Sequence, residues 1–382
     1  MTFVLLSNFL NHHQLPLCLN MYNMLGDDFR FIATTPMFEE QQRLGYPDLN
    51  SEYPFVIRTY DGVAQENQAK EWINKADVVV MGSAPFELIT QRLENNQLTF
   101  LYYERIYKKK YQKWKWPIRV WRFRKKYGRH KNCYLLCASA YTAGDFAKTL
   151  TFINKAYKWG YFPEVKEYDS VASLIDQKKS ASIMWAGRFI DWKHPEYVVE
   201  IAKRLRDDGY AFHINMIGNG AQWETIRDMI GEYGLREHVE LLGAMSPKQV
   251  RSYMEKSQIY LFTSDRQEGW GAVLNESMNS GCAVVACDAI GAVPFLMNSE
   301  HNGMIYRSGD LDDLYQKLKY LLDNPDECVR LGKNAYTTMT DVWNADKAAE
   351  RLFNLSEKLL QGEKERFLYT EGPCSKALIL KG

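Results

Sequence analysis

Short runs of apolar residues alternate with polar stretches along the whole chain of 382 residues. Unbroken apolar runs of four to eight residues are typical of strands buried on both faces of a parallel sheet. Between them apolar residues recur at helical spacing, for example in LCLNMYNML (17–25) and in 196–209, 222–234 and 343–360. The pattern therefore predicts an α/β protein. The predicted strands lie in 2–7, 29–35, 76–82, 97–103, 133–140, 182–189, 212–218, 239–245, 258–265 and 281–291.

A polar stretch rich in Ser, Asp and Lys occupies 167–182 and is predicted to be a linker. We therefore expect one domain over 1–170, a second over 171–342, and a final helix with a tail over 343–382. A chain of this length with 46% hydrophobic residues can form two domains with full cores.

The apolar runs are all shorter than the ~20 residues of a membrane span, and 2–10 lacks the features of a signal peptide. The seven cysteines are odd in number and form no C-x-x-C pair. Buried thiols in a cytoplasmic protein are the expectation.

Charge is distributed unevenly although the net charge is only +1. Thirteen Lys or Arg and no Asp or Glu lie between Arg105 and Lys131, together with seven Trp, Tyr or Phe. A solvated basic helix and a nucleic-acid groove could both use such residues, but this mixture favours an anionic membrane surface over nucleic acid. Pro117 predicts two short amphipathic pieces. The predicted membrane contacts are Lys108, Lys109, Lys110, Trp114, Trp116, Trp121, Arg122, Arg124 and Lys125.

The most specific motif is Glu268 to Glu276, EGWGAVLNE. It follows a predicted strand, passes through a glycine-bearing turn and enters a helical segment before the next strand. Free backbone N–H groups at such a turn suit a diphosphate, and carboxylates accept hydrogen bonds from sugar hydroxyls. The motif therefore predicts a nucleotide-sugar site at the carboxyl end of a strand.

With its surroundings this motif resembles the signature of retaining glycosyltransferases of family 4. The resemblance covers about 180–360 and reaches the first half only by architecture. It implies the GT-B fold, two Rossmann-like domains facing across a cleft, with a last helix that crosses back to the first domain. It also implies transfer of a sugar from a nucleoside diphosphate donor to an acceptor hydroxyl, with no cofactor or metal required. The acceptor expected here is a glycan or lipid-linked saccharide, used in cell-surface glycan synthesis at the inner face of the cell membrane.

The resemblance implies a role for each motif residue. Glu268 would hold the sugar hydroxyls, and Glu276 the ribose hydroxyls. Arg188 and Lys193 would stabilise the departing diphosphate, as cations at a strand end can do. The remaining expected donor contacts are Gly187, Gly218, Gly220, Ala244, Met245, Gly269, Trp270, Gly271, Ala272, Val273 and Leu274.

Three segments depart from the family pattern. The loop after the first strand has Asn11-His12-His13-Gln14 in place of a glycine pair. The run from Tyr102 to Arg105 stands where a histidine is common, and GAVPF (291–295) replaces a glycine-glycine-x-x-glutamate run. The candidate acceptor-side residues are therefore Asn11, His12, His13 and Glu104.

Metal chemistry has little support, because the histidines form no ligand spacing. Asp310-Leu311-Asp312 is better explained as an acidic helix start. Two other functions stay open: a nucleotide-sugar epimerase of GT-B shape, and a noncatalytic basic protein that binds membranes or nucleic acid through 105–131.

Overall fold

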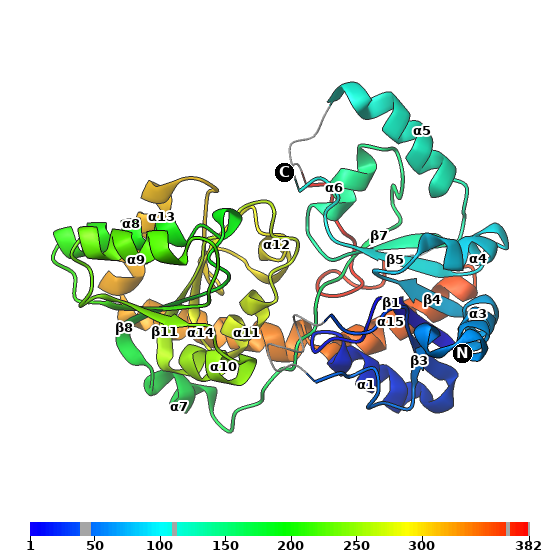
Figure 1. Ribbon diagram of the computed structural model, residues 1–382, viewed down its shortest axis with the longest axis horizontal. Helices are drawn as coiled ribbons and strands as arrows, with labels where there is room; N and C mark the ends of the chain where they lie inside the picture. The colour runs from blue at the N-terminus through cyan, green and yellow to red at the C-terminus, as the bar shows by residue number, and fades with distance from the viewer. Residues whose placement is uncertain (39–46, 109–112, 364–366, 381–382) are drawn as a thin grey trace. The chain divides into compact units, whose positions relative to one another are not determined.

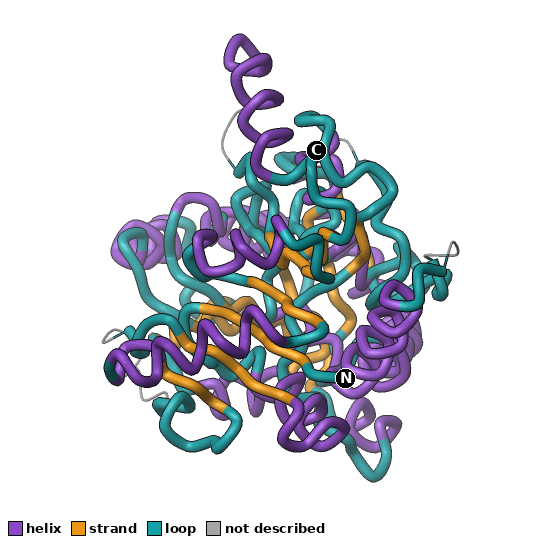
Figure 2. The backbone as a smooth tube through the Cα atoms, turned by 90° about the vertical axis from the view of Figure 1, so that its right-hand side faces the viewer, coloured by secondary structure: helices purple, strands orange, loops and turns teal. Residues whose placement is uncertain are grey.

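A computed structural model describes residues 1–38, 47–108, 113–363 and 367–380. The chain forms two compact units: unit 1 contains Met1–Glu164 and Trp343–Gly382, and unit 2 contains Val165–Val342. Each unit has one parallel sheet with helices on both of its faces (Figures 1 and 2). The predicted α/β class is confirmed, and both units are Rossmann-like.

Unit 1 has a seven-stranded sheet in the order β3-β2-β1-β4-β5-β6-β7. Its central strands are buried on both faces, which explains their unbroken apolar sequences. In β1, Leu6 pairs with Ile32 on one side and Met81 on the other. The strands are β1 Phe3–Ser7, β2 Phe29–Ala33, β3 Val56–Arg58, β4 Val78–Met81, β5 Thr99–Tyr103, β6 Cys133–Cys137 and β7 Ala156–Lys158.

Helices cover this sheet. The helix α15, from the end of the chain, packs on α1, and both helices bury apolar stripes at helical spacing. Beyond α15 the tail pairs with the edge strand β7: Cys374 N–H donates to Lys158 O at 2.8 Å, and Ala377 N–H to Ala156 O at 3.0 Å. The tail therefore satisfies backbone groups that an open edge would expose. The helices of unit 1 are α1 Leu15–Leu25, α3 Val63–Lys75, α4 Thr90–Glu94, α5 Trp116–Lys126, α6 Thr142–Ala147 and α15 Ala345–Leu360.

Unit 2 has a six-stranded sheet in the order β10-β9-β8-β11-β12-β13. Its strands are β8 Lys179–Ala186, β9 His213–Ile217, β10 Val239–Gly243, β11 Ser257–Phe262, β12 Ala283–Cys287 and β13 Met304–Tyr306. Its helices are α7 Val171–Asp176, α8 Pro195–Asp207, α9 Trp223–Glu232, α10 Pro247–Lys256, α11 Val273–Asn279, α12 Val293–Leu296, α13 Leu311–Asp323 and α14 Pro325–Thr337.

Strand order reverses once in each sheet. In unit 1 the chain leaves β1 toward β2 on one side and returns to β4 on the other, and in unit 2 the same happens at β8 between β9 and β11. At such a switch point the loops after the two neighbouring strands separate, and open α/β sheets bind ligands there. The loops after β1 and β4, and after β8 and β11, are therefore where a site is expected.

The predicted linker at 167–182 is wrong. Ser170 caps α7 by accepting the Ser173 N–H at 3.2 Å, and β8 begins at Lys179. The polar composition hides a short helix that buries little more than Ile175. The division between the units lies instead at Glu164 and Val165, rather than near residue 170.

The predicted break at Pro117 is also wrong. Pro117 lies in the first turn of α5, which runs unbroken to Lys126. Proline is tolerated there because the first N–H groups of a helix have no intrahelical partner. Three strands, β3, β7 and β13, were not predicted; each has only three residues.

Candidate active site

The predicted catalytic residues of unit 2 gather at its topological switch point. Arg188 and Lys193 lie in the loop after β8, and Glu268 lies in the loop after β11. Since β8 and β11 are hydrogen-bonded neighbours that run parallel, both loops leave the same edge of the sheet. The sheet thus brings together a cation and a carboxylate that are 75 residues apart in sequence.

Lys193 and Glu268 form an ion pair through Nζ and Oε2, and their side chains are only 13% and 11% exposed. Ser264, which is buried, donates a second hydrogen bond to Glu268 Oε2 at 2.9 Å. The carboxylate is therefore held in one position by two donors from different strands' loops. A charge-assisted contact of this kind is stronger than a neutral one.

The loop that carries Lys193 is fastened to β11 by a chain of hydrogen bonds. Trp185 Nε1–H donates to Thr263 Oγ1 at 2.9 Å, and the Thr263 hydroxyl donates to Lys193 O at 2.6 Å. Asp265 N–H donates to Trp192 O at 2.9 Å. These bonds fix the backbone of Lys193 and therefore the position from which its side chain extends.

Arg188 differs from Lys193 because its side chain is exposed. Its guanidinium carbon lies 5.7 Å from the Trp192 ring. Among the residues that the structure describes, no carboxylate pairs with it. A planar cation that is open to solvent at a strand end is available for an anionic ligand.

The glycines of 216–220 are required by close backbone packing. A Cβ on Gly218 would lie 1.8 Å from Gly187 O, and one on Gly220 would lie 2.5 Å from Phe189 O. Phe189 N–H also donates to Asn219 O at 2.9 Å. The turn after β9 therefore supports the Gly187 loop directly, a structural role that is compatible with a ligand beside it.

The turn of the Glu268 to Glu276 motif leaves backbone donors open. Gly271 has φ +89°, and a Cβ there would lie 2.5 Å from the Phe262 ring. Leu274 N–H donates to Gly271 O at 2.9 Å. Within the described part of the chain, the N–H groups of Gly271, Ala272 and Val273 donate no hydrogen bond. Three such donors at a strand end are the groups that a phosphate needs. Gly269 belongs to the same turn.

Trp270 contributes to this turn from the inside. Its side chain is fully buried, and its Nε1–H donates to Asn275 Oδ1 at 2.9 Å. Its carbonyl accepts the Ala292 N–H at 3.2 Å. The GAVPF segment, which departs from the family pattern, thus helps to hold the motif. Because its side chain is buried, Trp270 can contact a bound nucleotide-sugar only through its backbone.

Glu276 lies in the first turn of α11 and is half-buried. Burial raises the pKa of its carboxyl group, and the nearby Arg251 opposes that rise. Arg251 Nη1–H donates to Asn279 Oδ1 at 2.7 Å, and at 3.4 Å to the Glu276 backbone oxygen. Among the described residues no hydrogen bond reaches the Glu276 carboxylate. In the described residues, this carboxylate is therefore a hydrogen-bond acceptor that no protein group donates to.

Ala244 and Met245 follow β10, and Ala244 is exposed. The next residues form a helix start: Ser246 and Gln249 make a reciprocal capping box, and Pro247 opens α10. Asp310 likewise caps α13 by accepting the Asp313 N–H at 2.9 Å. Asp310-Leu311-Asp312 is thus an acidic helix start. Across the described ranges, no cluster of three or more His, Cys, Asp or Glu is placed to hold a metal ion.

The four candidate acceptor-side residues come together in one pocket of unit 1. The unit 1 pocket lies at the switch point between β1 and β4 and has a volume of about 510 Å³. Its principal lining residues are Asn11, His12, His13, Tyr102, Glu104, Lys108 and Tyr161. Tyr161 was missed from the sequence because it lies in a segment without a recognisable motif. Its hydroxyl donates to Glu104 Oε1 at 2.6 Å.

These pocket residues are not equally available to a ligand. Asn11 Oδ1 accepts the His13 N–H at 3.0 Å and the Gln14 N–H at 3.1 Å, so Asn11 shapes the entry to α1. Glu104 also accepts from Lys108 Nζ at 2.6 Å. Burial lowers the pKa of His12, and burial together with His12 lowers that of His13 to about 3.

Helix α5, with Trp114 in the short 3-10 turn before it, carries a cluster of exposed apolar and basic side chains. Trp114, Ile118 and Trp121, spaced four and three residues apart, are 75%, 60% and 64% exposed. Exposed cations on the same helix include Arg122, Arg124 and Lys125. We call these six residues the α5 surface. The helix lies at the periphery of unit 1, beside α6 (Figure 1).

Other aromatics of the basic segment are structural. Tyr107 and Tyr127 are buried, and Tyr127 packs edge-on against Phe146 of α6. Trp116 is partly exposed, and its Nε1–H donates to Lys148 O at 2.7 Å. Lys109 and Lys110 lie outside the described residues. In the ranges that the structure describes, no helix is both long and apolar enough to cross a bilayer.

Comparison with known proteins supports the class that this fold and site define. Residues 167–338, nearly all of unit 2, match the family model of glycosyl transferases group 1. The whole chain is similar to the crystal structure of Anabaena HepE in complex with UDP, with a TM-score of 0.69 over 94% of this chain and all of that one, at 12% identity. The fold is GT-B, as predicted, and the chain carries a glycosyltransferase domain.

Two curated relatives are each similar to less than half of the chain. Alpha-D-kanosaminyltransferase of Streptomyces kanamyceticus is 25% identical over 177 residues, 46% of this chain. The N-acetylgalactosamine-N,N'-diacetylbacillosaminyl-diphospho-undecaprenol 4-alpha-N-acetylgalactosaminyltransferase of Campylobacter jejuni is 27% identical over 171 residues, 45% of this chain. The chain matches 45% of the length of each. Assignment to family 4 stays a prediction.

Proposed function

We propose that the protein is a retaining glycosyltransferase that moves a sugar from a nucleoside diphosphate donor, bound by unit 2, to a hydroxyl of an acceptor bound by unit 1. The observation that carries this proposal is the convergence of Arg188, Lys193 and Glu268 at the switch point of the unit 2 sheet. Two cations suit a diphosphate and a positioned carboxylate suits sugar hydroxyls. The match of 167–338 to glycosyl transferases group 1 supports the same reaction class.

In this mechanism Glu268 orients the donor sugar by accepting hydrogen bonds from its hydroxyls. The bond between the anomeric carbon and the diphosphate oxygen breaks, and the negative charge that develops there is stabilised by Arg188 and Lys193. The acceptor oxygen bonds to the same face of the anomeric carbon, and its proton passes to the departing phosphate. The resemblance to the retaining family supplies this stereochemistry, and no metal or cofactor is part of the proposal.

Recognition of the nucleotide is assigned to groups around the same turn. The Glu276 carboxylate, which lacks a protein donor among the described residues, accepts the ribose hydroxyls. The open N–H groups of Gly271, Ala272 and Val273 bind the diphosphate. The backbone of Ala244 and Met245 meets the base, and Gly187, Gly218 and Gly220 allow the close approach of the loops beside it.

The acceptor class we propose is a lipid-linked saccharide of cell-surface glycan synthesis. The α5 surface combines exposed tryptophans with cations, as segments that lie on anionic membranes do. One curated relative bears a name that specifies a diphospho-undecaprenol substrate. The protein would then work on the inner face of the cell membrane, from the cytoplasmic side.

A thermal-shift screen of UDP, GDP and their sugars tests the donor assignment. A nucleotide at about 100 times its dissociation constant stabilises the folded protein by ~2.7 kcal/mol. The same screen on Arg188→Ala and Glu276→Ala should give smaller shifts. No stabilisation by any nucleotide would overturn the proposal. Product analysis with the donor alone separates transfer from epimerisation, because an epimerase converts the donor without an acceptor.

A further inference from the structure

The most unusual group outside the donor site is the imidazole of His13 in the unit 1 pocket. Its Nδ1 atom is shielded from solvent, and no hydrogen-bond partner for it lies among the described residues. Shielded polar atoms are nearly always paired in folded proteins. His13 Nδ1 is one of several such atoms in the described residues, and it lies in the loop after β1, at the switch point where a ligand is expected.

The ring of His13 is held in place by its neighbours. It stacks on Tyr161 with 5.8 Å between ring centroids and 14° between the planes. Asn11 accepts its N–H at 3.0 Å, and its carbonyl accepts the Phe162 N–H at 3.3 Å. Since both backbone groups and one ring face are fixed, Nδ1 has a defined position.

Protonation does not resolve the unpaired nitrogen. Burial, aided by His12, keeps the pKa of His13 at about 3, so the ring is neutral near pH 7. A neutral imidazole has one N–H donor and one bare nitrogen acceptor. With the proton on Nε2, Nδ1 is an acceptor that lacks a donor.

The charges of the pocket favour a neutral ligand. Lys108 is paired with Glu104 at 2.6 Å, and Arg105 lies 3.8 Å from Asp145. Each cation that lines the pocket thus lies beside a carboxylate, although Asp145 also pairs with Lys148 at 3.2 Å, so neither cation is free to bind a phosphate. Glu104, stacked aromatic rings and a bare imidazole nitrogen instead suit the hydroxyls and the faces of a sugar ring.

We propose that the unit 1 pocket binds the terminal saccharide of the acceptor, and that His13 Nδ1 accepts a hydrogen bond from one of its hydroxyls. His13 is then a specificity-determining residue, because a saccharide that lacks this hydroxyl leaves the nitrogen unpaired. The inference rests on the proposed function for its identification of the ligand as the acceptor.

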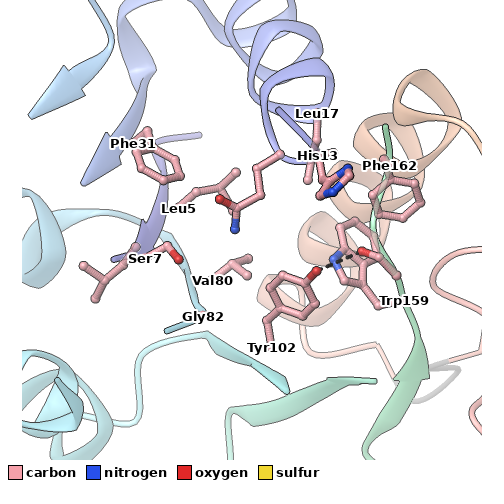
Figure 3. A pocket seen from close by; sticks show the side chains of 13 residues that line it. Leu5, Ser7, His13, Leu17, Phe31, Val80, Gly82, Tyr102, Trp159 and Phe162 are labelled. Carbon is pink, nitrogen blue, oxygen red and sulfur yellow. Dashed lines mark hydrogen bonds between the residues drawn. The ribbon is translucent and has the colours of Figure 1, made fainter. Parts of the chain in front are cut away.

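A structural water is the alternative. Next to the pocket lies a small cavity of about 20 Å³, lined by apolar side chains and by four polar ones, Ser7, His13, Gln14 and Tyr102 (Figure 3). This volume holds one water molecule. The Tyr102 hydroxyl already donates to Gly160 O at 3.1 Å. A permanent water on Nδ1 would make His13 a packing residue with no effect on saccharide binding.

Saturation-transfer NMR with methyl glycosides of glucose, galactose, mannose and N-acetylglucosamine distinguishes a saccharide ligand of His13 from a structural water. We expect transfer to at least one glycoside in the wild-type protein, and binding weakened about tenfold in His13→Leu, which has no acceptor atom. His13→Asn places an oxygen near the Nδ1 position and should retain binding. A lack of transfer from all four glycosides, or equal binding by His13→Leu, would overturn the proposal.

Two controls keep this result separate from folding and from the donor site. The melting temperature of each variant reports a packing defect, and the shift produced by UDP or GDP reports unit 2. Loss of glycoside binding in His13→Leu with an unchanged nucleotide shift supports the proposal. A protein that binds glycosides through His13 yet responds to no nucleotide would refute the proposed transferase function and leave this pocket standing.

Discussion

Lys193 Nζ and Glu268 Oε2 are paired, although the two residues lie 75 positions apart on different loops. In this arrangement the residue that would neutralise a diphosphate and the residue that would orient a sugar hold each other in place. A bound donor offers Lys193 a second anion and Glu268 a set of hydroxyl donors. Because both side chains are largely buried, neither pays the full cost of leaving water when the donor binds.

This pair should be measurable as a coupling energy. We expect Lys193→Met and Glu268→Gln each to lower the stability to urea, because each leaves a charged group largely buried without its partner. The double variant should lose less than the sum, with a coupling of about 1 to 3 kcal/mol. Additive losses would show that the pair contributes nothing.

Arg188 should affect turnover and not folding. Its side chain is exposed, and among the described residues no carboxylate pairs with it, so Arg188→Ala should melt close to wild type. Loss of one group that stabilises the transition state typically lowers kcat by about 10²- to 10³-fold. Release of nucleoside diphosphate measures this rate, and Lys333→Ala, which removes an exposed cation elsewhere in unit 2, is the control. A variant that unfolds would instead mark Arg188 as structural.

Glu276 should act on nucleotide binding itself. Hydrogen bonds to a charged acceptor contribute about 1.5 to 3 kcal/mol, so Glu276→Ala should weaken the binding of the free nucleoside diphosphate by roughly ten- to a hundredfold. Isothermal titration calorimetry measures this affinity. Glu276→Gln, which keeps the side-chain shape and one acceptor oxygen, should weaken it less. An unchanged affinity in the alanine variant would remove Glu276 from the ribose site.

The central strands of both sheets and the placing of Arg188, Lys193 and Glu268 at strand ends could be predicted, because parallel strands have unbroken apolar sequences and ligands bind at their carboxyl ends. The three-residue strand β13 could not be predicted, because such a run is too short to show a pattern of apolar and polar residues. Nor could the pairing of Lys193 with Glu268 or the stacking of His13 on Tyr161. Those contacts depend on loops far apart in sequence, whose local pattern says nothing about their partners.

His13 should make the protein less stable in acid. Its pKa falls from 6.5 to about 3 on folding. Between these values the unfolded chain binds a proton that the folded protein does not, so stability falls as pH is lowered, by up to about 1.4 kcal/mol per pH unit. The pKa of His12 is lowered in the same direction. The other titratable residues around this ring are Tyr102, Glu104 and Tyr161, and none of them is substituted in the variants described next.

Urea midpoints between about pH 7 and pH 4 measure this effect. His13→Asn removes the buried imidazole, so its stability should fall less steeply with acid than that of the wild type. His301→Asn, at an exposed position, is the control. If stability fell equally with pH in His13→Asn and in the wild type, the pKa of His13 would be the same in the folded and the unfolded protein.

The α5 surface should bind membranes through charge, because its exposed tryptophans alone present little apolar area. Each cation near an anionic surface contributes about 1 kcal/mol, and salt screens it over a Debye length of about 8 Å. Co-sedimentation with vesicles that contain phosphatidylglycerol should therefore be strong at low salt and fall steeply as salt rises. Vesicles of phosphatidylcholine alone should retain little protein.

Two sets of variants separate the charge from the tryptophans. Replacing Arg122, Arg124 and Lys125 by Gln should abolish sedimentation while leaving the nucleotide-induced thermal shift intact, because the proposed donor site lies in unit 2. The same charge change at Lys203, Lys319 and Lys333 is the control and should leave binding intact. Trp114→Ala with Trp121→Ala should weaken binding and keep its salt dependence, since those side chains add apolar contact and no charge. Equal sedimentation with neutral and anionic vesicles, or loss in the control variant as well, would refute a membrane surface on α5 and favour an acceptor free in solution.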